Sequence, residues 1–409
     1  MTDPPGPVAV VGGSLAGLHA AEALLESPEV SAVTVLDAER RDPYDRPPLS
    51  KELLTGTWEP GQCGLPPLSD PRLTRRGGAP VTALRTADLS LTFADGHTEQ
   101  FGGGIVIATG AVPRVLPGWR LPGVHVLRTM DDALGLRAGL AARPGARVVI
   151  VGCGFIGTEV AAACLLGGHP VTILEAQASP FEALGADVGA ALIAPLLARG
   201  CELVTHAAVA GLSGTGRVKA VTLEDGTLIP AEVVVLGLGV DPATDWLAGS
   251  GLNLAGGVHC DSTLSVANRV TAAGDVARWP NHRFGEFRRI EHWDNAVRQG
   301  RHAGQRLLAD HGLNPVRDFE SVPWVWSDQL GHKIQVVGST LGFDEVVIAH
   351  GTLPAAKFVA LYRRGDQLTA ALAMNEPKLI ARYRALLARP VSWLAVTAGL
   401  AGTAAPAAG

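Results

Sequence analysis

The chain has 409 residues, a length that suits two or three domains with their own cores. Hydrophobic residues make up 47% of it and charged residues 18%, an ordinary globular balance that excludes a disordered protein. The net charge of −5 gives no global electrostatic reason to bind nucleic acid or an anionic membrane, so we expect neither as a partner.

The first motif in chain order is VAVVGGSLAGLHAAEALL, which begins at Val8. A strand-like run leads through Gly12 and Gly17 into a helix-like run, and the next strand, SAVTVLD, ends at Asp37. Such a turn aims unpaired N–H groups and the positive end of the helix dipole at one spot, which attracts phosphate. Ser14 replaces the middle glycine of GxGxxG, but serine is small and its hydroxyl can donate to phosphate. We predict a dinucleotide site here.

A proline-rich loop, RRDPYDRPPLSKELL, follows this βαβ unit. Beyond it, LTFADGHTE reads as a hairpin with Asp95 and Gly96 at its turn.

The second motif, VVIVGCGFIGTEVAAAC, fits GxGxxG at Gly152, Gly154 and Gly157. It follows the strand-like run ARVVIV, and the strand PVTILEA, about twenty residues further on, ends at Glu175. An acid there accepts hydrogen bonds from the adenosine ribose. With no arginine in LEAQASPFEALG, it also favours NADH over NADPH. The alternative is a plain glycine turn with Glu175 on the rim of a parallel sheet.

The rest of the chain completes these two units and adds a third. VKAVTLEDGTLIPAEVVVLGLG closes the second unit with a turn at Asp225-Gly226, and the strand before Gly274-Asp275 belongs to the first sheet. Further strands, with a turn near Gly365, precede a closing helix, EPKLIARYRALLAR. The predicted fold is α/β, with two Rossmann-like dinucleotide-binding domains, the first discontinuous, plus a C-terminal α+β domain. The expected boundaries are 1–110 with 241–316 for the first dinucleotide-binding domain, 111–240 for the second, and 317–409 for a β-rich domain with a short tail.

The cysteines and the two terminal sequences indicate the cellular compartment in which we expect the protein. The five cysteines form no CxxC pair, so we interpret them as small buried residues in a reducing compartment and expect no metal site. The N-terminus lacks the pattern of a secretory signal, which predicts a cytoplasmic protein. The last stretch, PVSWLAVTAGLAGTAAPAAG, is too weakly apolar to insert into a membrane, so we expect a short packed piece and a disordered tail.

The motif order is distinctive. PYDRPPLSK, IATGA, LRT, AAGDVA, EHWDNAVRQG and VPWVWSDQLG, placed around two glycine turns, resemble the NADH-dependent ferredoxin reductases, FAD flavoproteins of the glutathione-reductase superfamily. The resemblance covers essentially the whole chain. It implies an enzyme that transfers a hydride from NADH to FAD and then single electrons to an iron-sulfur ferredoxin. That ferredoxin supplies a cytochrome monooxygenase or a ring-hydroxylating dioxygenase.

The resemblance also implies residue roles. Lys51 lies beside the reactive edge of the flavin, Glu159 lies near the nicotinamide and pairs with Lys51, and Trp326 lies near the flavin on the path of the electrons. These three are the expected catalytic residues. The expected FAD contacts are Gly12, Ser14, Leu15, Ala16, Gly17, Asp37, Arg46, Pro47, Lys51, Val81, Ala108, Thr109, Gly110, Arg128, Gly274, Asp275, Glu291, His292, Trp293 and Trp326. The expected NAD(H) contacts are Gly152, Gly154, Phe155, Ile156, Gly157, Glu159, Glu175 and Gly239.

Several assignments have plainer alternatives. Asp275 could cap the next helix, Lys51 and Glu159 could be an ordinary surface lysine and helix glutamate, and Trp326 could be a core residue. An acidic ferredoxin partner would need local basic surface, although solvated arginines are common. The docking candidates are Arg283, Arg288, Arg289, Arg298 and Arg301, with Arg72, Arg75 and Arg76 elsewhere.

Two other functions stay open at this point, as do a monomer and a homodimer. One is a flavin-dependent NADH oxidase, or a disulfide- or peroxide-reducing relative, and the reducing relative would need a reactive cysteine facing the flavin. The segment PPLSKELL has no thiol where the superfamily's disulfide reductases carry a cysteine pair. A flavoprotein of the apoptosis-inducing-factor type would instead change shape or assembly when NADH reduces it.

Overall fold

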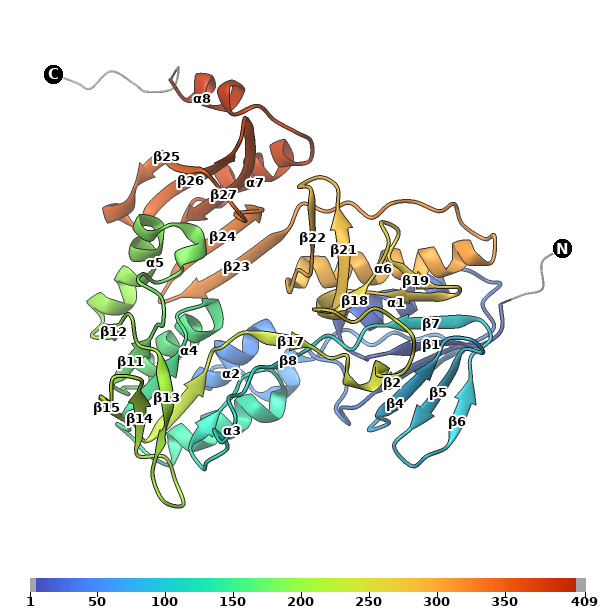
Figure 1. Cartoon of the computed structure of the whole chain (residues 1–409), viewed down its shortest axis with the longest axis horizontal. Coiled ribbons are helices and arrows are strands. Elements are labelled where there is room, and N and C mark those ends of the chain that lie inside the picture. Colours follow the sequence, from blue (N-terminus) through green and yellow to red (C-terminus); the bar gives the residue numbers. More distant parts are fainter. Residues whose placement is uncertain (1–4, 402–409) are drawn as a thin grey trace. The chain divides into compact units, whose positions relative to one another are not determined.

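The computed structural model describes residues 5–401, and their contacts divide into two compact units (Figure 1). Unit 1 comprises Met1–Asp45, Gly64–Val112 and Val240–Pro323; unit 2 comprises Arg46–Cys63, Pro113–Gly239 and Trp324–Gly409. Within residues 5–401, no helix combines the length and the apolar character needed to cross a membrane.

Unit 1 is built on a six-stranded sheet in the order β19-β20-β7-β1-β2-β3. The predicted strand before Gly274 does complete this sheet, because β20 pairs parallel with β7, with Val270 opposite Ile105. The prediction of a discontinuous first sheet is therefore confirmed. Its strands are β1 (Val8–Val11), β2 (Val33–Asp37), β3 (Leu73–Gly77), β7 (Gly104–Ile107), β19 (Ser265–Ala267) and β20 (Val270–Ala272).

Helices α1 (Leu15–Leu25) and α6 (Trp293–Asp310) pack closely against each other in unit 1. The approach depends on two glycines of α6, since a Cβ at Gly300 would lie 2.2 Å from the carbonyl oxygen of Ala16, and one at Gly304 would lie 2.6 Å from that of Ala20. The hairpin predicted around Asp95-Gly96 is confirmed in a smaller sheet. The smaller strands are β4 (Val81–Arg85), β5 (Ser90–Phe93), β6 (Thr98–Gln100), β18 (Val258–His259), β21 (Ala277–Asn281) and β22 (Glu286–Arg288).

Unit 2 has a five-stranded parallel sheet in the order β12-β11-β10-β16-β9. The predicted second βαβ unit is confirmed, and Asp225-Gly226 forms the turn between β14 and β15. The strands are β9 (Val124–His125), β10 (Val148–Val151), β11 (Val171–Leu174), β12 (Glu202–Val204), β13 (Val209–Ser213), β14 (Ala220–Leu223), β15 (Leu228–Pro230) and β16 (Val233–Leu236). The helices are α2 (Glu52–Thr55), α3 (Met130–Ala141), α4 (Phe155–Leu166) and α5 (Ala186–Ala198).

The C-terminal part of unit 2 is an antiparallel sheet in the order β23-β24-β27-β26-β25. The turn near Gly365 and the closing helix are confirmed, and a further helix follows. The expected disordered tail falls largely on residues 402–409, outside the described part. The elements are β23 (Trp324–Gln329), β24 (His332–Gly338), β25 (Glu345–Thr352), β26 (Lys357–Arg364), β27 (Gln367–Met374), α7 (Pro377–Leu387) and α8 (Trp393–Ala401).

Short elements complete the chain. Strands β8 (Ala111–Pro113) and β17 (Val240–Pro242) lie where the chain passes from one unit to the other. The 3-10 helices are η1 (Pro47–Ser50), η2 (Pro60–Cys63), η3 (Glu182–Leu184), η4 (Asp245–Leu247), η5 (Gly274–Val276) and η6 (Leu353–Ala355).

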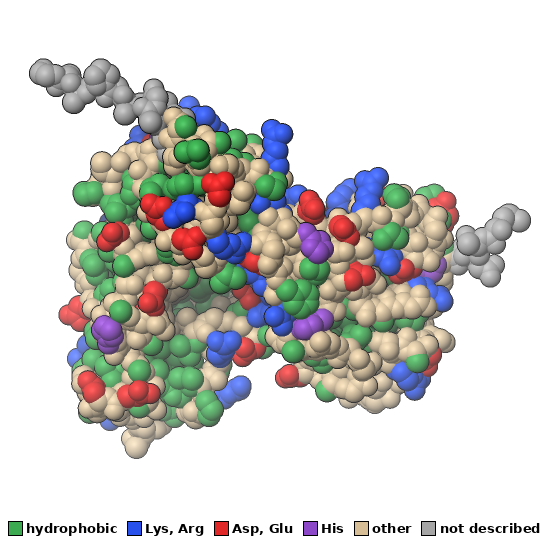
Figure 2. Space-filling view, turned by 45° about the horizontal axis from the view of Figure 1, so that its top comes forward, with side chains coloured by type: hydrophobic (Ala, Val, Ile, Leu, Met, Phe, Trp, Pro, Cys, Tyr) green, Lys and Arg blue, Asp and Glu red, His purple; other side chains and the backbone are tan. Residues whose placement is uncertain are grey.

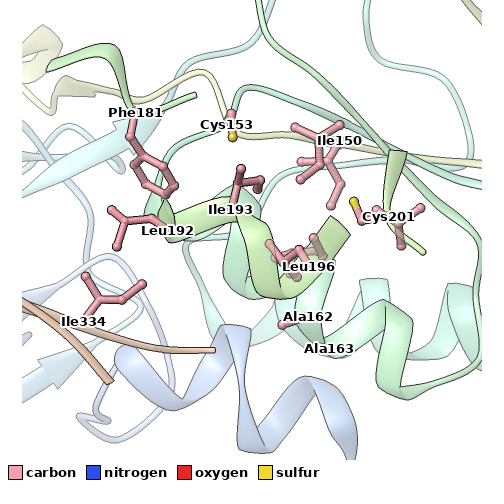
Figure 3. Packing of buried hydrophobic residues seen from close by; sticks show 14 of the residues in the cluster. Ile150, Cys153, Ala162, Ala163, Phe181, Leu192, Ile193, Leu196, Cys201 and Ile334 are labelled. Carbon is pink, nitrogen blue, oxygen red and sulfur yellow. The ribbon is translucent and has the colours of Figure 1, made fainter. Parts of the chain in front are cut away.

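One apolar cluster links the parallel and antiparallel sheets of unit 2. Ile150 of β10, Ile193 of α5 and Ile334 of β24 all belong to it (Figure 3). The C-terminal sheet is thereby packed against the helices of the second βαβ unit. Contacts group residues 46–63 and 324–409 with residues 113–239, and the three-domain boundaries stay a prediction.

Candidate dinucleotide and catalytic sites

The first glycine turn joins β1 to α1 in unit 1. Gly12 has φ +112°, which disfavours any other residue, and a Cβ there would lie 2.2 Å from the carbonyl oxygen of Ala108. A Cβ at Gly17 would lie 1.8 Å from the carbonyl oxygen of Gly12. The protein's own backbone therefore requires glycine at both positions. Ser14 is the N-cap residue of α1 and, among the described residues, its side chain makes no capping hydrogen bond.

The acid that ends β2 lies directly over this turn. A Cβ at Gly13 would come within 2.4 Å of the Asp37 Oδ2 atom. Asp37 Oδ1 accepts a hydrogen bond of 3.0 Å from the backbone N–H of Glu39, and the Nη2 atom of Arg75 lies 3.7 Å from Oδ2. The carboxylate is thus placed at the turn with a cation beside it.

Other residues expected to contact FAD gather around the same turn. A Cβ at Gly274 would lie 2.9 Å from the Cβ of Ala16, so η5 approaches the first turn of α1. The backbone N–H of Gly274 donates to Gln299 Oε1 at 2.9 Å, while the Gln299 Nε2 atom is buried without a partner in the described part of the chain. Buried polar atoms normally have a hydrogen-bond partner, so an unpaired Nε2 atom beside a phosphate-type turn is what we expect where a cofactor binds.

The start of α6 carries three more expected FAD contacts. Trp293 donates from Nε1 to Asp45 Oδ1 at 2.8 Å. Burial, with Arg288 adding to it, lowers the pKa of His292 to about 4, so its imidazole is neutral at pH 7. Glu291 pairs with Arg289 at 3.0 Å. The remaining FAD candidates of unit 1 lie at the expected elements: Leu15 opens α1, Val81 opens β4, Thr109 and Gly110 follow β7, and Asp275 lies in η5.

The second glycine turn joins β10 to α4 in unit 2. Gly152 has φ +105°, and a Cβ there would lie 2.4 Å from the carbonyl oxygen of Gly237. A Cβ at Gly157 would lie 2.4 Å from the carbonyl oxygen of Gly152. At Gly154, by contrast, a Cβ would meet no atom of the described residues within 4 Å.

A cleft of about 660 Å³ opens beside this second turn. Glu175 lines it, accepting hydrogen bonds of 2.9 Å from the backbone N–H groups of Cys153 and Gln177. Phe155 and Phe181 also line it, with ring centroids 5.2 Å apart. Of the residues that the structure describes, no lysine or arginine lines the cleft. The turn, the acid and the open space fit a dinucleotide without a ribose phosphate.

Four of the eight NAD(H) candidates lie outside the lining of this cleft, namely Ile156, Gly157, Glu159 and Gly239. Ile156 is on the first turn of α4 with 49% of its surface exposed, and Gly239 follows β16 with φ +80°.

Lys51 and Glu159, predicted from resemblance to pair, do form an ion pair in unit 2. Lys51 Nζ lies 2.7 Å from Glu159 Oε2, and Glu159 is only 4% exposed. The same carboxylate accepts hydrogen bonds of 2.5 Å from the hydroxyl groups of Ser50 and Ser327. Whether this pair acts in catalysis stays a prediction, but its burial sets it apart from an ordinary surface lysine and glutamate.

Trp326 and Trp324 stack along β23, with ring centroids 5.0 Å apart and planes tilted by 30°. The guanidinium carbon of Arg384, from α7, lies 4.8 Å from the Trp324 ring centroid. The remaining FAD candidates of unit 2 are Arg46, Pro47 and Arg128. Arg46 Nη1 donates to the carbonyl oxygen of Arg128 at 2.6 Å, and Pro47 opens η1.

Two family models match the chain. Residues 6–300 match the model described as pyridine nucleotide-disulphide oxidoreductase, and residues 324–399 match the one described as reductase C-terminal. The chain belongs to the pyridine nucleotide-disulphide oxidoreductase family. It is an oxidoreductase that uses FAD and NAD(H), which confirms the predicted enzyme class, cofactors and fold class.

Individual members of this family are similar over nearly the whole chain. The ferredoxin–NAD(+) reductase subunit of a benzene 1,2-dioxygenase system from Pseudomonas putida is 33% identical, covering 91% of this chain and 90% of the relative. Human apoptosis-inducing factor 3 is 33% identical over 93% of this chain and 63% of its own length. A solved covalent putidaredoxin reductase–putidaredoxin complex contains a chain with a TM-score of 0.88, 29% identical, covering 98% of this chain and 97% of that one.

Family members that reduce disulfides use a reactive thiol, and the thiols of this chain are buried. Burial raises the pKa of Cys153 and of Cys164 to about 12, and that of Cys201 to about 11, which keeps each thiol protonated at neutral pH. The interpretation of the cysteines as small buried residues is confirmed.

The arginines expected to dock a partner mostly pair with acids of their own unit. Arg288 pairs with Glu286, Arg298 with Asp294, and Arg301 with Glu22 and Glu26. On the face shown in Figure 2, Lys and Arg side chains are interspersed with Asp and Glu side chains. If these arginines bind an acidic partner, their attraction for it is reduced, because acids of the same unit already neutralise part of their charge. The remaining pairs are Arg72 with Asp70, Arg75 with Asp42, Arg76 with Glu99 and Arg289 with Glu291.

The sequence motifs contained further site residues that we did not predict. Ser50 stands next to Lys51, and Ser327 and Gln329 follow Trp326 in the same motif. Because successive side chains of a strand point to opposite faces, Ser327 and Gln329 share the face opposite Trp324 and Trp326. That alternation was the available signal. Gln299 and Asp45 carried no comparable signal, since only folding brings Gln299 to Gly274 and Asp45 to Trp293. Gly13 lies within the first glycine motif, but its closeness to Asp37 is visible only in the structure.

Proposed function

We propose that this protein is an NADH-dependent ferredoxin reductase, which oxidises NADH and passes electrons one at a time to an iron-sulfur ferredoxin. The observation that carries the proposal is the buried ion pair of Lys51 and Glu159 close to the glycine turn of unit 2. The chain also has the glycine turn of unit 1, so it has one turn for each of two dinucleotides. The similarity to a dioxygenase-system ferredoxin–NAD(+) reductase and to a putidaredoxin reductase supports the identity of the acceptor.

Unit 1 carries the turn for FAD and unit 2 the turn for NADH. Bound FAD supplies the two-electron to one-electron chemistry, because it accepts a hydride and can release electrons singly. Arg46 and Arg128 would offset the charge of the FAD pyrophosphate, and Asp37 and Asp275 would accept hydrogen bonds from its ribose and ribityl hydroxyls. Lys51 supplies a fixed positive charge that favours electron density arriving beside it, which is electrostatic catalysis and not acid–base work.

Glu175 makes NADH the preferred nucleotide. A ribose phosphate would stand next to its carboxylate in a cleft whose described lining has no cation to compensate. Trp326, which stacks with Trp324 and is partly buried, would shield the flavin or shorten the path of electrons to a docked cluster.

The partner is a transiently bound, acidic ferredoxin that in turn supplies a cytochrome monooxygenase or a ring-hydroxylating dioxygenase. The protein works as a monomer or homodimer in the cytoplasm, where NADH is available and its thiols stay reduced.

The test is NADH-driven reduction of purified two-iron and three-iron ferredoxins, followed under anaerobic conditions with an artificial dye as control acceptor. We expect reduction of at least one ferredoxin at a rate comparable with dye reduction. Reduction of the dye with no ferredoxin reduced would contradict the assignment of the acceptor.

Similarity to apoptosis-inducing factor 3 favours one second candidate, a redox-sensing flavoprotein. It would show slow turnover and a long-lived charge-transfer absorbance after NADH is added. Fast turnover with a ferredoxin excludes it.

A further inference from the structure

A chain of hydrogen bonds connects β23 of the C-terminal sheet to α4 of the NAD-type βαβ unit, both within unit 2. Ser327 donates from Oγ to Glu159 Oε1 at 2.5 Å. Gln329 donates from Nε2 to Ser327 Oγ at 2.9 Å and to Thr158 Oγ1 at 2.8 Å. The strand is therefore tied to two adjacent residues on the first turns of α4.

Every member of this chain is buried. Ser327 and Thr158 are fully inaccessible, and Gln329 is 4% exposed. Water cannot replace a lost partner easily at such a place, so the position of each group depends on the others.

The carboxylate of Glu159 is held at both of its oxygens. Oε2 accepts from Ser50 and pairs with Lys51 Nζ at 2.7 Å, whereas Oε1 accepts from Ser327. A carboxylate bound at Oε2 alone can rotate about its last torsion. With Oε1 fixed by Ser327, that rotation is blocked, and the distance to Lys51 is fixed with it.

We propose that Ser327 and Gln329 are positioning residues for hydride transfer, which hold Glu159 so that Lys51 keeps its charge at the reacting centre. This inference rests on the proposed function, because it assigns the C-terminal sheet a part in the step that Lys51 promotes. Gln329 acts one bond further away, by orienting the Ser327 hydroxyl toward Glu159.

The test measures flavin reduction by NADH in anaerobic stopped-flow experiments on the FAD-loaded full chain. Ser327→Ala removes the bond to Oε1, and Gln329→Met keeps length but removes the amide N–H groups. We expect each variant to lower the limiting rate, Ser327→Ala by about tenfold, with the Kd for NADH within about twofold of its original value. Ser327→Thr, which keeps a hydroxyl group, restores most of the rate. Ser339→Ala is the matched control, a buried serine beside the same sheet but outside the chain of bonds.

Double variants separate positioning from a general structural role. If Ser327 acts through Glu159 and Lys51, adding Ser327→Ala to Lys51→Met lowers the rate no further. A wild-type rate in Ser327→Ala, or the same tenfold loss in both backgrounds, overturns the inference. If Lys51→Met itself reduces flavin at the wild-type rate, the catalytic assignment of the proposed function fails first and takes this inference with it. FAD content and the urea midpoint, measured for every variant, identify any that have not folded.

Discussion

The two glycine turns share one backbone plan but differ around the acid. In unit 1 the carboxylate of Asp37 has Arg75 at 3.7 Å, while in unit 2 the carboxylate of Glu175 lines a cleft that, among described residues, holds no lysine or arginine. A partly neutralised acid imposes little selection by charge. An uncompensated one repels a ribose phosphate. The first turn therefore suits a cofactor that stays bound, and the second suits a carrier that must be selected each time it binds.

The residue that follows the first glycine of each turn also differs between the units, and it differs together with the acid that faces the turn. In unit 1 it is Gly13, where a Cβ would lie 2.4 Å from Asp37 Oδ2; in unit 2 it is Cys153, whose backbone N–H donates to Glu175 Oε2 at 2.9 Å. Aspartate is one methylene shorter than glutamate, so its carboxylate lies over the turn only if that residue has no side chain. The length of the acid and the size of this residue are thus matched.

The largest effect is expected from substitutions that disrupt one of the two glycine turns and leave the other intact. Gly17→Ala puts a Cβ 1.8 Å from a carbonyl oxygen of unit 1, and Gly157→Ala puts one 2.4 Å from a carbonyl oxygen of unit 2. Each forces the backbone apart and lowers the free energy of unfolding by about 3 kcal/mol. We expect Gly17→Ala to lose FAD, and Gly157→Ala to keep FAD but lose reduction by NADH. Flavin absorbance after gel filtration and urea unfolding measure both. Equal loss of FAD in the two variants would contradict the separate roles.

The next largest effect is expected from removing one of the two acids, and it tests the contrast between Glu175 and Asp37. Glu175→Ala removes the repulsion of a ribose phosphate, so the ratio of kcat/KM for NADH over NADPH falls by about thirtyfold, or about 2 kcal/mol. Asp37→Asn, the control at the other turn, leaves this ratio unchanged. Steady-state dye reduction with both nucleotides measures it. An unchanged ratio in Glu175→Ala would exclude the ribose role.

Cys153 has no titratable counterpart in unit 1, where Gly13 stands. Burial raises its pKa from 9.0 to about 12, so the unfolded chain loses this proton at a lower pH than the folded one. Its contribution to stability is therefore complete below pH 9 and is lost as the pH rises toward 12. Between pH 8 and pH 10 the free energy of unfolding should fall by about 1 kcal/mol more in the original protein than in Cys153→Ser. Urea unfolding at the two pH values measures it, and parallel losses in both proteins would contradict the shift.

The smallest effect is expected from exchanging the residues at the middle glycine position of the two turns, Ser14 in unit 1 and Gly154 in unit 2. A Cβ at Gly154 meets open space in the described structure, so Gly154→Ser and the reciprocal Ser14→Gly should each change the free energy of unfolding by less than about 0.5 kcal/mol. FAD content and the KM for NADH should stay within twofold of the original values. A large loss of FAD in Ser14→Gly would show that the serine hydroxyl itself holds the phosphate.

Both turns, their acids and the return of β20 to the first sheet were predictable, because each depends on local patterns of strand, glycine and helix that the chain repeats. The surroundings of the acids were not. Arg75 is separated from Asp37 by 38 positions (75 − 37) and reaches it only because β3 pairs with β2 in register. Ser327 and Glu159 come from segments 168 positions apart, and the tie between them exists only once the C-terminal sheet packs against α4. Sequence patterns identify the elements, whereas contacts between distant elements decide which charges are compensated.

The most direct test of the two-turn account is an anaerobic titration of the purified, FAD-loaded protein with NADH while the flavin absorbance is recorded. The account predicts a yellow protein that is bleached by about one equivalent of NADH, and by NADPH only at far higher concentration. A colourless protein that takes up no FAD, or a bound flavin that NADH leaves oxidised, would contradict it.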